Sequence, residues 1–72
     1  MGCIGERAAQ AIRERAKLNG TKITSECENL DVTRKTLSVW TRSITDPNAY
    51  FLQQMALAGY DVIYILTGEK HD

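Results

Sequence analysis

Five side chains between residues 33 and 42 could contact a polyanion. They combine hydroxyl groups and positive charges: Thr33, Arg34, Lys35, Ser38 and Arg42. Arginine can form paired hydrogen bonds with guanine or phosphate, and hydroxyl groups can bond to either acceptor. No acidic residue occurs between Val32 and Thr45, although the whole chain has a formal net charge of zero. This local basic stretch therefore indicates DNA as the first candidate partner.

The same stretch also has an apolar side. Leu37 and Trp40 are three residues apart, which places them on one face of a helix, and Val32 precedes that helix. Leu30 and Asp31 are typical of a helix end followed by a tight turn. The pattern predicts two short helices joined by a turn, the second with a core face and a basic face. In an arbitrary protein, such a basic face is more often a solvated surface.

The rest of the chain predicts an all-α fold in one domain over residues 1–72. Five helices are expected, over residues 4–18, 22–30, 33–42, 47–58 and 61–66. A polar tail follows over residues 69–72. Glycines that can adopt left-handed geometry end three of the helices: Gly20, Gly59 and Gly68. Side chains that can cap helix starts are Thr21, Thr33, Asp46 (before Pro47) and Asp61.

A chain of 72 residues has room for one small core and little space for an enclosed active site. The only histidine is His71, in the polar tail, and no nucleophile–base pair or glycine-rich phosphate loop is recognisable. We therefore expect no enzyme, no cofactor, no metal and no small-molecule substrate. No apolar run approaches the ~18 residues of a membrane span. A cytoplasmic protein without a membrane partner is expected, associated with the nucleoid of a bacterial host cell when bound to DNA.

Several other side chains have structural interpretations. Trp40 is expected in the core and not as a stacking platform for bases. Cys27 is expected to pack between helices, with a redox or ligand role as the alternative, and its pairing with Cys3 is not expected. Glu26, Glu28 and Asp31 are expected to face solvent, where such acids could repel DNA.

Two segments resemble the Cro and repressor class of phage and prophage regulators, the XRE family. Residues 32–40, VTRKTLSVW, are similar to the family segment VSRRTLSRW, and residues 59–68, GYDVIYILTG, are similar to the family ending GxDVxYLLTG. The resemblance spans residues 4–68. Four positions depart from it: Ile23 replaces a glutamine, Glu26 an apolar residue, Asp31 a glycine and Thr41 a glutamate.

The resemblance implies a compact five-helix fold of the lambda-repressor type with a helix-turn-helix. It also implies that six side chains face the DNA, as in that family: the five polar ones named first and Val39. Arg34 is expected to contact guanine, Lys35 and Arg42 to contact phosphates, and Val39 to pack on a thymine methyl group. The implied function is that of a transcription regulator, a repressor or Cro-like protein bound to a palindromic operator in double-stranded DNA.

An apolar surface near the C-terminus is expected to form a two-fold homodimer. Its candidate residues are Phe51, Tyr60, Val62, Ile63, Tyr64 and Leu66. Such a dimer would place two recognition helices about 34 Å apart, which matches successive major grooves. The alternative is a helix-turn-helix scaffold that binds a protein, as an antitoxin-like or adaptor module.

Overall fold

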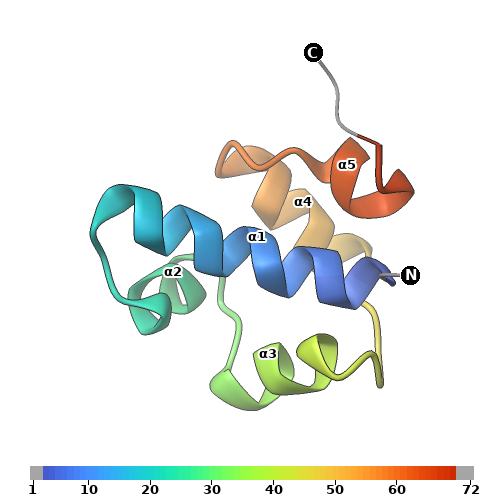
Figure 1. Ribbon diagram of the computed structural model, residues 1–72, viewed down its shortest axis with the longest axis horizontal. Helices are drawn as coiled ribbons and strands as arrows, with labels where there is room; N and C mark the ends of the chain where they lie inside the picture. The colour runs from blue at the N-terminus through green and yellow to red at the C-terminus, as the bar shows by residue number, and fades with distance from the viewer. Residues whose placement is uncertain (1–2, 70–72) are drawn as a thin grey trace.

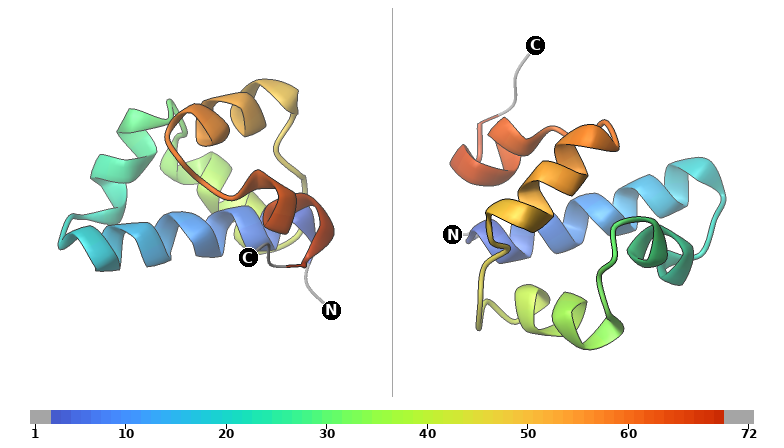
Figure 2. Two further views of the ribbon diagram at one scale, coloured as in Figure 1. Left: turned by 90° about the horizontal axis from the view of Figure 1, so that it is seen from above. Right: turned by 180° about the vertical axis from the view of Figure 1, so that it is seen from behind.

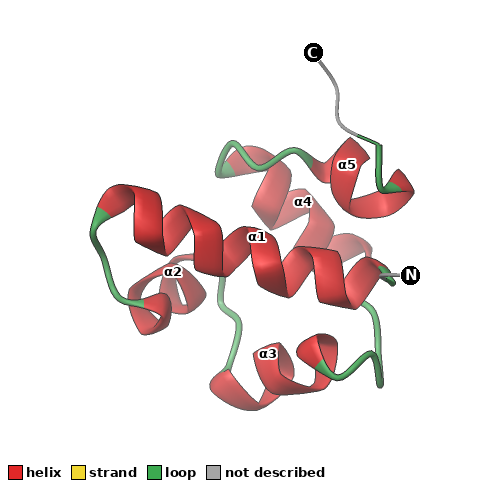
Figure 3. Ribbon diagram, in the orientation of Figure 1, coloured by secondary structure: helices red, strands yellow, loops and turns green. Residues whose placement is uncertain are grey.

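The computed structural model describes residues 3–69 and contains five α-helices in that range (Figure 1). They are α1 (Ile4–Asn19), α2 (Ile23–Asn29), α3 (Arg34–Thr41), α4 (Ala49–Leu57) and α5 (Val62–Thr67). No strand occurs among the described residues (Figure 3), which confirms the all-α prediction. The helix ends differ from the predicted ones by one or two residues. Most of the polar tail, with His71, lies outside the described residues.

α1 is the central helix of the fold and contacts α2, α3 and α5 (Figure 1). α2 also contacts α3, and α4 contacts α5. When the molecule is seen from behind, α4 crosses in front of α1 (Figure 2, right). The whole arrangement measures 29 × 26 × 21 Å. None of the helices in residues 3–69 is both long and apolar enough to cross a bilayer.

The hydrophobic core takes side chains from all five helices and from the turn after α2. Its buried members are Ala8, Ala9, Ile12, Cys27, Leu30, Val32, Leu37, Trp40, Met55, Tyr60 and Ile65. Gly5 allows α1 to approach the end of α3 closely, because a β-carbon there would lie 2.5 Å from the Thr45 carbonyl oxygen and 3.2 Å from the Trp40 backbone. Small residues on α1 thus set its distance from α3.

Three of the predicted helix boundaries are confirmed by their caps. The Thr33 hydroxyl accepts a hydrogen bond from the Thr36 N–H at the start of α3, and the Asp61 carboxylate accepts one from Tyr64 N–H at the start of α5. Gly20 ends α1 in left-handed geometry, at φ 66°. In each case the cap satisfies backbone groups that have no partner inside the helix.

Two of the four predicted N-terminal caps are wrong, because both side chains have different partners. Thr21 does not cap α2, since its hydroxyl donates to the Glu26 carboxylate (3.2 Å) and Lys22 occupies the cap position. Asp46 does not begin α4, which is capped by Asn48. The Asp46 carboxylate instead accepts a hydrogen bond from Gly5 N–H (3.0 Å) in the first turn of α1.

The burial pattern corrects two predictions about α2. The spacing of Ile23, Cys27 and Leu30, at positions i, i+4 and i+7, predicts one inward face, but Ile23 is 36 % exposed while the other two are buried. Glu26 was expected to face solvent and is instead buried, because Tyr60 and Thr21 donate hydrogen bonds to its carboxylate. Cys27 and Trp40 are core residues, as predicted, and both Cys3 and Cys27 are free thiols.

Candidate nucleic-acid interface

The turn between α2 and α3 is closed by backbone geometry and by core contacts. Asp31 adopts left-handed geometry, at φ 60°, and its N–H donates to the Glu28 carbonyl (3.2 Å). The Val32 N–H donates to the Cys27 carbonyl (2.8 Å). Because Leu30 and Val32 on either side of Asp31 are both buried, the turn orients α3 against α1 and α2.

α3 exposes a polar face on the side away from the core. Five of the six predicted contact residues are exposed: Thr33, Arg34, Lys35, Ser38 and Arg42. Arg34, Ser38 and Arg42 are four residues apart, so they share one face of the helix. Within the described residues, no hydrogen bond or ion pair engages the side chains of Arg34, Lys35 or Arg42, so their side-chain N–H donors are available to a ligand. This surface is referred to below as the α3 face.

Thr33 and Val39 fit the predicted interface less well than the other residues. The Thr33 hydroxyl accepts from Thr36 N–H (3.0 Å) and donates to the Thr36 hydroxyl (2.9 Å), so the helix cap already engages it. Val39 is half buried and packs against the core, which leaves only part of its side chain for a partner. Thr33 therefore caps α3, and Val39 packs in part against the core.

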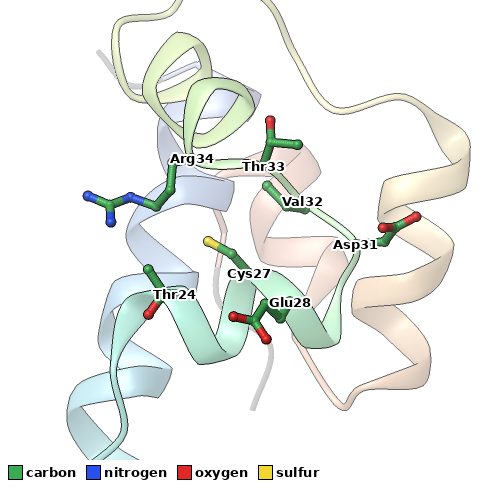
Figure 4. Close-up of a pocket in the computed structure, with 7 residues that line it drawn as sticks. All are labelled: Thr24, Cys27, Glu28, Asp31, Val32, Thr33 and Arg34. Carbon is green, nitrogen blue, oxygen red and sulfur yellow. The ribbon is translucent and has the colours of Figure 1, made fainter.

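A pocket of about 360 Å³ lies beside the turn, between α2 and the start of α3 (Figure 4). It is lined by Thr24, Cys27, Glu28, Asp31, Val32, Thr33 and Arg34. Cys27 is buried among these residues, and burial raises the pKa of its thiol against the opposing effect of Arg34 and Arg13. The thiol at this pocket is therefore protonated at neutral pH and is a packing group.

A second pocket, of about 230 Å³, lies between α1 and the α3 face and is called here the arginine pocket. It is lined by Arg13, Arg34, Leu37, Ser38, Thr41 and Arg42. Arg13 reaches it from α1 and donates a hydrogen bond to the Thr41 hydroxyl (2.8 Å), which in turn donates to the Leu37 carbonyl (2.8 Å). α1 thus adds a third guanidinium to the two of α3.

Arg13 is not among the contact residues predicted from the sequence. The spacing of Arg13 along α1 could have indicated its place beside a neighbouring helix. Arg13 lies four residues after Ala9 and three before Ala16, and both of these alanines are buried. A charged residue in line with buried positions lies at the edge of a helix–helix contact, where a long side chain can reach the neighbouring helix.

Behind α2, a buried polar cluster connects this helix to the segment between α4 and α5. The Tyr60 hydroxyl donates to the Glu26 carboxylate (3.3 Å), and the Arg15 guanidinium lies 3.9 Å from the centre of the Tyr60 ring. Burial and then the neighbouring Glu26 carboxylate raise the pKa of Tyr60 from 10.0 to about 12. The cluster thus holds α2 in place against the segment that precedes α5.

The residues predicted for a dimer interface differ in how far they are exposed. Tyr60 is buried in the core, so it is withdrawn from any surface that a partner could reach. Phe51 packs edge-on against Trp40, with ring centres 5.4 Å apart, and Val62 and Tyr64 are half buried against the core. The two remaining candidates are exposed hydrophobic residues, Ile63 (47 %) and Leu66 (45 %).

No group of three or more His, Cys, Asp or Glu side chains that could hold a metal ion occurs within residues 3–69. Comparison of the chain with protein-family models, curated proteins and solved structures finds no match. A function can therefore be proposed only from the α3 face and from the resemblance of residues 32–40 and 59–68 to segments of the Cro and repressor class.

Proposed function

We propose that this chain is a sequence-specific DNA-binding transcription regulator of the Cro and repressor class. In this proposal α2, the turn and α3 form a helix-turn-helix within a fold of the lambda-repressor type. α3 enters the major groove, and two copies of the chain bind the two halves of a palindromic operator. The proposal rests mainly on one observation: α3 exposes cationic donors without internal partners in a stretch free of acidic residues.

The size and charge of α3 suit the major groove. The groove of B-DNA admits one α-helix, and its base edges display distinct patterns of donors and acceptors. Arg34 is the first residue of α3, the end that lies nearest the bases in this mode of docking, so we assign it to guanine. Lys35 and Arg42 are assigned to phosphates, where a positive charge suffices, and Ser38 to a base or the backbone.

The apolar side chains Ile63 and Leu66 support the homodimer. Both are about half exposed on the short helix α5, whose Val62, Tyr64 and Ile65 pack towards the core. Pairing of this helix with its copy would cover them and give the two α3 helices the two-fold relation that a palindrome requires. The dimer interface proposed here contains fewer residues than the one predicted from the sequence, because Tyr60 belongs to the core.

A protein-interaction module is the second candidate. The acids Glu28 and Asp31 beside the turn and the zero net charge favour it, because both reduce attraction to a polyanion. A protein partner would then be held by exposed apolar residues such as Leu57 and Ile63.

Selection from a pool of random DNA duplexes tests the proposal. The wild-type chain and an Arg34→Ala variant are each incubated with the pool, and the bound duplexes are sequenced. We expect the wild type to enrich a palindrome with half-sites about one helical turn apart, and the variant to lose preference at one position of each half-site. Recovery of the unselected pool by the wild type would favour the interaction module.

A further inference from the structure

The arginine pocket has the composition of an oxyanion site. Three of its six lining residues are arginines, two carry hydroxyl groups, and none of the six is acidic. Its volume of about 230 Å³ is several times the roughly 30 Å³ that one water molecule occupies in the liquid, so a tetrahedral anion can enter. Its cations come from two helices, which distinguishes it from a charged stripe along one helix.

The charge of Arg13 is not neutralised in the structure. Its guanidinium donates to the uncharged Thr41 hydroxyl, and it forms no ion pair with a carboxylate within residues 3–69. Arginine has five N–H donors in a planar fork, so most of them remain after this single bond. The bond to Thr41 also directs the side chain of Arg13 across the gap between α1 and α3. Arg13 is thus positioned and still carries a full charge.

We propose that the arginine pocket binds one phosphate oxyanion, with Arg13 and Arg42 as its charged ligands and the Ser38 hydroxyl as a further donor. Paired N–H···O bonds from guanidinium to phosphate are among the stronger hydrogen bonds in proteins. Arg34 lines the N-terminal end of the same pocket and adds to its positive potential, while its own donors remain available for a base.

The phosphate can come from the DNA backbone or from a free phosphorylated ligand. Binding of a backbone phosphate rests on the proposed function, whereas binding of a free phosphorylated ligand does not. A backbone phosphate held by Arg13 would anchor α1 as well as α3 to the DNA and would fix how deeply α3 enters the groove. A free phosphate would occupy the same place and compete with DNA.

Two titrations test the site, each with matched variants. Arg13→Gln removes one ligand, and Arg13 is exposed with a single hydrogen bond, so the fold is expected to persist. Lys17→Gln removes one charge from an exposed position of the same helix outside the pocket. In the first arm, isotope-labelled protein is titrated with inorganic phosphate against chloride at constant ionic strength. Saturable shifts are expected in the signals of Arg13, Ser38 and Arg42.

We expect Arg13→Gln to weaken inorganic phosphate binding about tenfold, while Lys17→Gln leaves it unchanged. In the second arm, Arg13→Gln should weaken binding of an enriched and a scrambled duplex by the same factor and lower the salt slope by about 1. Phosphate binding without duplex binding would support the pocket as a site for a free ligand and contradict the proposed function. Equal behaviour of Arg13→Gln and Lys17→Gln in both arms would overturn the site.

Discussion

At the scale of single residues, the turn residue Asp31 combines a backbone requirement with an unfavourable charge. Its φ of 60° lies in the left-handed region, where a side chain with a local polar group is tolerated better than alanine and less well than glycine. Asp31 also carries a negative charge close to the proposed DNA-binding surface, because it and Arg34 line the same pocket. Stability and DNA affinity at this position can therefore be separated by substitution.

Substitution of Asp31 should give an order of stability set by backbone strain. Asp31→Ala is expected to lower the free energy of unfolding by about 1 kcal/mol, and Asp31→Gly to leave it unchanged or raise it by up to about 1 kcal/mol. Urea denaturation measures both. Equal values for the alanine and glycine variants would contradict the strain argument. Asp31→Asn, which keeps the turn chemistry and removes the charge, should strengthen DNA binding.

Removal of each cationic side chain of the α3 face should change DNA binding in its own way. Arg34→Ala is expected to cost about 1–3 kcal/mol of binding free energy and to relax specificity at one base pair. Lys35→Ala and Arg42→Ala should weaken binding to all sequences and flatten the salt dependence. Affinity for single-base variants of the enriched duplex gives the comparison. The assignment of Arg34 to a base would be wrong if the three variants behaved alike.

At the scale of helices, some features follow from neighbouring residues and others from distant ones. The caps Thr33 and Asp61 bond to backbone N–H groups three residues away, so their roles could be predicted from local sequence. The hydrogen-bond partners of Asp46 and Arg13 could not be predicted in this way, because they lie 41 and 28 residues away along the chain. Glu26 was misassigned for the same reason, since its partner Tyr60 is 34 residues distant.

The candidate site likewise has one part that follows from local sequence and another that depends on contacts between distant residues. The α3 face could be predicted because helical periodicity separates Leu37 and Trp40 from the basic residues of one short segment. The contribution of α1 to the arginine pocket depends on the crossing of two helices, which local periodicity does not determine. The packing of Val39 against the core likewise depends on tertiary contacts.

The Glu26–Tyr60 pair should make stability depend on alkaline pH. The folded-state pKa of Tyr60, raised to about 12, exceeds its ordinary value of 10.0, so the folded chain holds the phenol proton more tightly. This contribution to the free energy of unfolding is complete below pH 10 and is lost as the pH rises towards 12. Denaturation of the wild type and Tyr60→Phe across this range should show a steeper decline for the wild type.

Tyr60→Phe also leaves the Glu26 carboxylate with one hydrogen-bond donor fewer. We expect the variant to be less stable than the wild type at pH 7 by about 1–3 kcal/mol, because a buried acceptor loses a partner. Parallel stability curves for the two proteins from pH 10 to 12 would show that Tyr60 does not carry the alkaline dependence.

At the scale of the whole molecule, a neutral chain is proposed to bind a polyanion through an uneven distribution of charge. Its nine basic and nine acidic side chains balance, yet three arginines line one pocket beside α3. The exposed apolar residues of α5 lie on another helix, so the proposed DNA-binding surface and the proposed dimer surface are separate. Each surface can therefore be altered without changing the other.

Disruption of the α5 surface should abolish the dimer and spare the fold. Ile63→Lys and Leu66→Lys place a charge where pairing would bury an apolar side chain, so both variants are expected to sediment as monomers at tens of micromolar, where the wild type is expected to be a dimer. Leu57→Lys, at an exposed apolar site on α4, serves as the control. A monomeric wild type that binds DNA as one copy would contradict the two-fold arrangement.

The most direct test of DNA recognition by the α3 face is the affinity for an enriched palindromic duplex and for a scrambled duplex, measured by fluorescence anisotropy at several salt concentrations. Tighter binding of the palindrome is predicted, with log affinity falling linearly with log salt at a slope of about −0.9 per phosphate contact. Arg34→Ala should reduce the difference between the two duplexes. Equal affinities for both duplexes, independent of salt, would contradict the account.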